Sequence, residues 1–142
     1  MNKSLPARTL LVLPFSLLAL AGCASSDGDA TQPAAAPISI SNLELTPKSI
    51  PVGSVSALTG TVDFQAPDGN VREIAAEVTL PNGSSQTLPR APVQAATGKT
   101  SGPVTVALAL GPPGAGKYVI TVRLVDDRGG TSNAVSADVE AK

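Results

Sequence analysis

From Ile38 to the end of the chain, apolar and polar residues alternate in short runs. Isoleucine and leucine occupy every second position from 38 to 45, and the phase slips by one residue near Asn42. The same alternation recurs over residues 58–64, 74–80, 104–110, 118–124 and 135–139, with a shorter run around residues 87–88. A period of two places successive side chains on opposite faces of a β-strand. The pattern predicts about seven strands, and the phase slip predicts a bulge in the first.

Turn signals separate these runs. Pro67-Asp68-Gly69, Pro81-Asn82-Gly83 and Asp127-Arg128-Gly129-Gly130 combine residues that preset φ or accept a positive φ. Residues 89–102 have no period and are expected to form the longest loop. No segment after residue 38 has an amphipathic helical pattern of ten residues or more. The fold class is therefore all-β, a single antiparallel β-sandwich.

The beginning of the chain has a different pattern. Lys3 and Arg8 form a short basic region, and residues 9–19 (TLLVLPFSLLA) are apolar, which is typical of a signal peptide. The alternative is a membrane-spanning helix. Residues 9–21 would cover only about 20 Å of a hydrocarbon core about 30 Å thick, and Pro14 interrupts them. The signal peptide is therefore preferred.

Leu20, Ala21, Gly22 and Cys23 follow the apolar region directly. This tetrapeptide resembles the lipobox of bacterial lipoproteins, and Cys23 is the only cysteine in the chain. The resemblance implies cleavage before Cys23, a diacylglycerol on its sulfur and a fatty acyl chain such as palmitate on its amine. In Gram-negative bacteria, Ala24 after the cysteine resembles the signal for the cell outer membrane. The alternative is an ordinary signal peptide that is cut near Ala24.

Three parts follow from these patterns. Residues 1–22 are the expected lipoprotein signal peptide, 23–37 the lipidated cysteine with a flexible linker, and 38–142 the sandwich domain. Without Lys3 and Arg8, the 10 basic residues fall to 8, against 11 acidic residues. This mildly acidic balance argues against nucleic acid as a partner, because nucleic-acid binding requires a basic surface.

The last two predicted strands give the most specific similarity of the domain. Residues 116–127 (GKYVITVRLVDD) and 129–133 (GGTSN) resemble the closing hairpin of immunoglobulin-like modules of the fibronectin type III and polycystic-kidney-disease types. The resemblance implies an immunoglobulin-like sandwich in which Tyr118 is structural, with its hydroxyl bonded to the backbone. The chain has no tryptophan and no cysteine pair. Aliphatic packing around Phe64 is therefore expected to form the core.

One motif has the spacing of a phosphate-binding loop. Gly111–Lys117 fits G-x-x-x-x-G-K, but Tyr118 occupies the position of the required serine or threonine. The residues that follow, YVITVRLV, alternate as a strand, whereas a phosphate site needs a helix N-terminus. The segment is expected to be a turn between strands, and no nucleotide is expected.

The remaining candidates for chemistry are carboxylates. The chain has no histidine, and the expected anchor uses Cys23, which excludes catalytic sites built on histidine or a free thiol and leaves zinc without nitrogen or sulfur ligands. Asp126 and Asp127, with Asp63 or Asp68, are weak candidates for a calcium site. Solvated charges at a strand end are the preferred interpretation of these residues. We expect no cofactor.

These observations predict a non-catalytic, lipid-anchored protein of the bacterial cell envelope. Its immunoglobulin-like domain would bind an envelope or extracellular protein or act as a spacer, and it would be attached to the membrane through the lipid on Cys23. An exposed strand edge or the segment 89–102 would form the contact. Two alternatives are a small envelope hydrolase that uses carboxylates and a calcium-stabilised adhesive domain.

Overall fold

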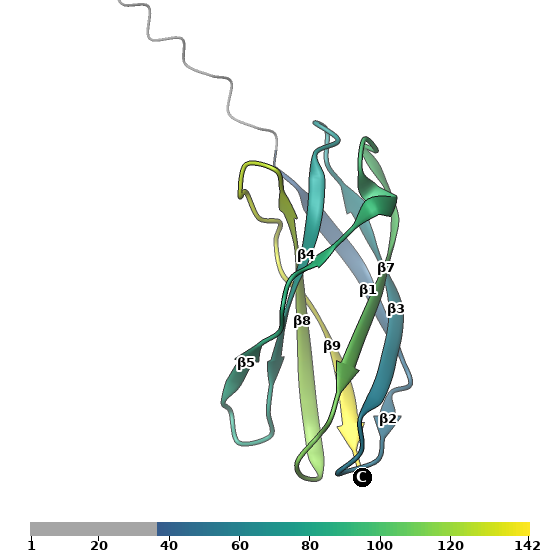
Figure 1. Cartoon of the computed structure of the whole chain (residues 1–142), viewed down its shortest axis with the longest axis vertical. Helices are drawn as coiled ribbons and strands as arrows, with labels where there is room; N and C mark the ends of the chain where they lie inside the picture. Colours follow the sequence, from purple (N-terminus) through teal and green to yellow (C-terminus); the bar gives the residue numbers. More distant parts are fainter. Residues whose placement is uncertain (1–36) are drawn as a thin grey trace, which may run out of the picture. The chain divides into compact units, whose positions relative to one another are not determined.

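The structure, a computed structural model, describes residues 37–142 (Figure 1). Its elements, in chain order, are β1 (Ser39–Thr46), β2 (Ser49–Ile50), β3 (Ser56–Gln65), β4 (Val71–Thr79), β5 (Ser85–Thr87), β6 (Ala91–Pro92), the 3-10 helix η1 (Gln94–Ala96), β7 (Ser101–Leu110), β8 (Gly116–Asp126) and β9 (Val135–Ala141). Each run of alternating residues is a strand, as predicted. The additional strands β2 and β6 contain two residues each.

The strands form two sheets that face each other (Figure 1). The three-stranded sheet has the order β1-β3-β7, and the six-stranded sheet has the order β2-β9-β8-β4-β5, with β6 also paired to β4. All pairings are antiparallel except the short one between β2 and β9. The chain passes between the sheets before and after β2, again after β3, and before and after β7. This arrangement confirms the predicted all-β, immunoglobulin-like sandwich.

The core lies between the inner faces of the two sheets. Leu58 and Val62 of β3 meet Ile120 and Val122 of β8 in one apolar cluster, and all four side chains are fully buried. Aliphatic residues make up most of this cluster, because period-two alternation directs branched side chains inward from both sheets. Phe64 adds the one phenylalanine ring of the described chain and is 2 % exposed.

The phase slip in the first strand is a β-bulge, as predicted. The pairing of β1 with β3 shifts between Ser41 and Glu44, and Asn42 has a φ of 54°. Asparagine tolerates this left-handed conformation better than most residues. Opposite the bulge, a Cβ on Gly60 would collide with the carbonyl oxygen of Glu44. The bulge therefore explains why glycine interrupts an otherwise branched strand.

The segment 89–102 differs from its prediction as an irregular loop. It contains β6 and η1, and β7 already begins at Ser101. Val93 and Ala96 are three residues apart and both point into the core, where they are 6 % and 0 % exposed. A 3-10 turn places residues i and i+3 on the same side, so this crossing between the sheets closes one end of the core. Neither residue belongs to a period-two pattern. The alternation of apolar and polar residues therefore does not predict that this segment contributes to the core.

Candidate functional site

The residues of the expected lipid anchor lie outside the described part of the chain. Leu20, Ala21, Gly22 and Cys23 precede residue 37, as do the whole range 1–22 and nearly all of the range 23–37. Among the described residues, no helix has the length and apolar character needed to cross a membrane. The candidate surfaces of the sandwich are therefore considered separately from the anchor.

Asp126 accepts hydrogen bonds from its own turn, and Asp127 accepts one from the loop before β4. The Oδ1 atom of Asp126 accepts the backbone N–H of Arg128 at 2.9 Å and that of Gly130 at 2.6 Å, which closes the turn after β8. Asp127 Oδ1 accepts the side-chain amide of Asn70 at 3.0 Å. Asp126 is only 9 % exposed, so the expectation that it is a solvated charge is wrong for this residue. Backbone donors replace water around its carboxylate.

The described residues bring together no group of three or more histidine, cysteine or acidic side chains that would suit a metal ion. Asp63 lies on β3, where its Oδ2 accepts the side-chain amide of Asn42 at 3.0 Å. Asp68 lies in the turn between β3 and β4. The four aspartates that the sequence offers for calcium thus do not form such a group, and three of them accept hydrogen bonds from neighbouring groups.

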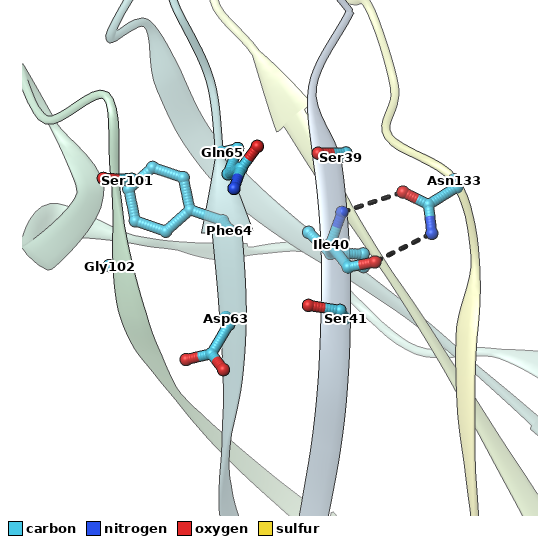
Figure 2. Close-up of a pocket in the computed structure, with 9 residues that line it drawn as sticks. All are labelled: Ser39, Ile40, Ser41, Asp63, Phe64, Gln65, Ser101, Gly102 and Asn133. Carbon is cyan, nitrogen blue, oxygen red and sulfur yellow. Dashed lines mark hydrogen bonds between the residues drawn. The ribbon is translucent and has the colours of Figure 1, made fainter.

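A shallow hollow of about 530 Å³ crosses the three-stranded sheet near the beginning of β1 (Figure 2). Residues of β1, β3 and β7 line it together with Asn133, namely Ser39, Ile40, Ser41, Asp63, Phe64, Gln65, Ser101 and Gly102. Asp63 is the one titratable side chain in this lining. Glycosidase chemistry of the usual kind requires two carboxyl groups, so the lining by itself does not form such a pair.

Asn133 holds the outer edge of β1. Its Oδ1 accepts the backbone N–H of Ile40 at 2.8 Å, and its Nδ2 donates to the backbone carbonyl of Ile40 at 2.9 Å (Figure 2). The amide therefore takes the place of one residue of a neighbouring strand. Ser132 fixes the loop beside it, because its hydroxyl accepts the N–H of Leu124 and donates to the carbonyl of Asn133. Sequence reasoning missed this contact, whose partners are 93 positions apart.

Tyr118 lies near the beginning of β8 and is 2 % exposed. Its hydroxyl donates to the backbone carbonyl of Gly114 at 2.9 Å. The ring is part of the core cluster, while the hydroxyl anchors the loop that leads into β8. Both contacts are structural, since they join the side chain to its own sandwich.

The phosphate-loop pattern Gly111–Lys117 joins β7 to β8 and so connects a strand with a strand. Two of its carbonyl groups accept hydrogen bonds, that of Gly114 from Tyr118 and that of Pro112 from the backbone N–H of Gly53. A phosphate-binding loop instead presents backbone N–H groups to the anion and continues into a helix. The geometry is that of a turn between two sheets.

The two outer faces of the sandwich differ in charge. On the six-stranded sheet, Lys117 pairs with Asp138 at 2.7 Å, and Arg90 pairs with Glu73 at 3.4 Å. On the three-stranded sheet, the exposed residues of β3 and β7 are mostly small and uncharged: Ala57, Thr59, Thr61, Thr105, Ala107 and Ala109. The second face therefore permits close approach of another backbone, and it continues to the free edge of β7.

No protein-family model matches this chain, and no curated protein matches it. Solved structures do match. One is the PKD domain of an M14-like peptidase from Thermoplasmatales archaeon SCGC AB-540-F20, with 18 % identity and a TM-score of 0.43, covering 76 % of this chain and 98 % of that one. Another is a Niemann-Pick type C2 protein from the Japanese carpenter ant, with 11 % identity and a TM-score of 0.48, covering 76 % and 95 %.

A third similar structure is that of Pseudomonas fluorescens alkylpurine DNA glycosylase AlkC bound to DNA containing an abasic site analog. The identity is 13 % and the TM-score 0.47, and the match covers 75 % of this chain and 31 % of the glycosylase. This chain thus spans about a third of that protein. All three similarities concern the fold alone.

Proposed function

We propose that this chain is a lipid-anchored, non-catalytic protein of the bacterial cell envelope whose immunoglobulin-like domain binds a protein partner or acts as a spacer. The observation that carries the proposal is Leu20-Ala21-Gly22-Cys23 at the end of an apolar segment, followed by a linker and then a sandwich. The motif accounts for the one cysteine of the chain, and the linker accounts for the change of composition at Ile38.

The dimensions of the linker and the domain support a spacer. The composition of residues 24–37 predicts a linker, and fourteen residues of coil would span about 20 Å on average. The ten residues of β7 extend over about 33 Å, and β7 runs along the long axis of the sandwich (Figure 1). The described chain begins at one end of this axis and ends at the other (Figure 1). Together these lengths are sufficient for a spacer of several nanometres.

The aspartates support a non-catalytic role. A carboxylate that acts as a general acid or base must reach a substrate proton. Asp126 is buried and accepts two backbone N–H groups, while Asp127 accepts the amide of Asn70. The carboxylates named for the hydrolase and calcium alternatives therefore already have structural partners.

The experiment that tests the anchor is mass spectrometry of the N-terminal peptide from native membranes. The proposal requires Cys23 as the first residue, carrying a diacylglycerol and an amide-linked acyl chain. The matched control is Cys23→Ser in the full chain, which is expected to leave the sandwich folded but to release the protein from the membrane fraction. Met1 or an unmodified Ala24 at the N-terminus would overturn the proposal.

The experiment that tests the binding role is crosslinking in intact cells with lysine-reactive reagents, followed by identification of the crosslinked peptides. Lysines lie on several sides of the domain, including exposed Lys117. The binding role requires a reproducible protein neighbour whose crosslinks map to one face. Recovery of the chain without any neighbour would leave the spacer role and exclude stable binding.

A further inference from the structure

The outer edge of β7 is a long strand edge without a neighbour. All ten residues of β7, from Ser101 to Leu110, pair with β3 on one side. Apart from this pairing with β3, residues 104–110 form no backbone hydrogen bond with the rest of residues 37–142. Such an edge presents a row of unpaired N–H and C=O groups that can pair with another extended chain.

The other strand edges of the described sandwich are shorter or closed; the longest is that of β9, where residues 135–139 lie beyond the pairing with β2. Asn133 occupies the edge of β1 at Ile40, and the bulge at Asn42 distorts the strand just beyond. The strands at the borders of the six-stranded sheet, β2, β5 and β6, contain two, three and two residues. Natural proteins use these devices to prevent edge-to-edge pairing. Their presence elsewhere makes the open edge of β7 an exception.

The sequence of this edge also lacks protective residues. Residues 104–110 are VTVALAL, with no charge, no proline and no glycine, whereas Gly102 and Pro103 lie at the beginning of the strand. Val104 and Val106 are buried, but Leu108 and Leu110, which share their inward face, remain partly exposed at the edge. A neighbouring strand would cover these two leucines further, which adds an apolar contribution to the backbone pairing.

We propose that β7 pairs antiparallel with β7 of a second copy of this chain, with a two-fold axis at Ala107. The inference rests on the proposed function and names the protein partner of that non-catalytic module. In a pairing across a two-fold axis, inward residues must face inward residues. An axis at Ala107 satisfies this condition, because Val106 faces Leu108 of the second copy and Val104 faces Leu110 of the second copy. It uses all of residues 104–110 and leaves Pro103 outside the ladder.

The absence of charge near this edge suits a second copy as its occupant. A two-fold axis places each residue near its own equivalent, so a charged residue close to the axis would meet a like charge. Neither β7 nor its outward neighbours Ala57, Thr59 and Thr61 on β3 carry charge. The pairing would join the two three-stranded sheets into one continuous sheet whose outer face near the axis consists of alanine and threonine.

The association is expected to be weak in dilute solution. Edge pairing over seven residues buries less than the roughly 1,000 Å² typical of stable interfaces. Attachment of both copies to one membrane raises their effective concentration and compensates for the small area. The pairing should therefore be tested in the full, membrane-attached chain.

The test is disulfide crosslinking of Ala107→Cys in the full chain in its native envelope, under a mild oxidant. Its matched control is Ala57→Cys, an exposed alanine on the same outer face but one strand further in. The proposal expects a disulfide-linked species of twice the chain mass for Ala107→Cys and none for Ala57→Cys. The wild-type chain, whose one cysteine is Cys23, gives the background level of disulfide-linked product.

A second set of variants tests the register. Thr105→Cys together with Ala109→Cys should crosslink efficiently, because each residue faces the other across the axis, whereas either change alone should not. Residues four apart in one strand are about 13 Å from each other, so an internal disulfide is excluded. Adding Ala107→Lys to the double variant places two like charges across the axis and should reduce crosslinking about two- to fivefold. Circular dichroism of each variant confirms that the sandwich is folded.

Each outcome has a definite meaning. A product of twice the chain mass that requires Ala107→Cys supports the pairing. A disulfide between Ala107→Cys and a different protein overturns pairing with a second copy but supports the proposed binding function. No product from folded Ala107→Cys, or equal dimer formation from Ala57→Cys, overturns the inference. The mass of the N-terminal peptide tests the lipid anchor independently of this pairing.

Discussion

Replacing Asn133 is the sharpest test of how the sandwich holds its first long strand. Asn133→Ala removes both hydrogen bonds to Ile40, at 2.8 and 2.9 Å, and leaves the N–H and the carbonyl of Ile40 without these partners. Ile40 is 5 % exposed and pairs with Phe64 in the ladder between β1 and β3. Each lost hydrogen bond is worth about 1 kcal/mol, with a further penalty if the backbone groups stay dry.

The expected loss in free energy of unfolding is therefore about 2–3 kcal/mol, measured by urea denaturation followed by circular dichroism. The matched control is Asn70→Ala, which removes one exposed hydrogen bond, to Asp127, and should change stability by less than about 0.5 kcal/mol. A loss for Asn133→Ala no larger than that of the control would refute the role of Asn133 as the substitute neighbour of β1.

Asn133→Asp adds a pH test of the same contact. The carboxylate keeps an acceptor for the Ile40 N–H but turns its other oxygen toward the Ile40 carbonyl, which repels it. The charged form is disfavoured in the folded state, so the pKa of the new carboxyl is raised above its unfolded value. A protonated carboxyl restores the donor. The difference in stability between the variant and wild type should therefore be smallest below the unfolded pKa of the carboxyl, and the variant should lose stability as the pH rises through the raised folded-state pKa. A pH-independent difference would contradict the geometry.

Three further substitutions test the core, the corner and the bulge by the same unfolding measurement. Phe64→Ala should cost about 3 kcal/mol or more, because the ring is 2 % exposed; a cost below about 1 kcal/mol would contradict its central place. Tyr118→Phe removes the bond to the Gly114 carbonyl while keeping the ring, and we expect a loss of about 1 kcal/mol; an unchanged midpoint would show that the hydroxyl does not stabilise the loop. Gly60→Ala drives a Cβ into the Glu44 carbonyl and should destabilise by more than 2 kcal/mol, whereas Ala57→Gly on the same strand should cost about 1 kcal/mol or less.

The sandwich was predictable because its signal is local. The alternation that places Leu58, Val62 and Phe64 inward is visible within one strand, and the bulge appears in the sequence as a change of phase near Asn42. Turn residues such as Gly83, with a φ of 83°, mark where strands end. Each feature depends on neighbours only a few positions away.

The missed features depend on distant parts of the chain. Val93 and Ala96 are buried because a crossing segment closes the end of the core, and no short-range pattern records this. Asn133 finds its partner at Ile40, 93 positions away. Asp126 offered a usable local signal, since an aspartate followed four residues later by Gly130 is suited to a side-chain-closed turn. A Cβ at Gly130 would lie only 2.6 Å from the Oδ2 atom of Asp126, so the turn requires glycine at this position.

The two borders of the three-stranded sheet explain why pairing through β7 would stop at two copies. The border at β1 is closed by Asn133 and the bulge, so a second copy can add only at β7 and the assembly cannot grow into a fibre. Because β1 and β7 run in the same direction, antiparallel pairing places the two Ile38 residues at opposite ends of the dimer.

Two copies anchored in one membrane can therefore pair without a long linker if the strands lie along the membrane surface, with the two-fold axis along its normal. Both chains then reach the lipid at equal height, and a long linker is not needed. Deleting residues 26–33 from the full Ala107→Cys chain should consequently leave the disulfide-linked dimer intact. Loss of the dimer on this deletion, with the chain still anchored and folded, would mean that the copies need the linker in order to pair and therefore do not lie along the membrane surface.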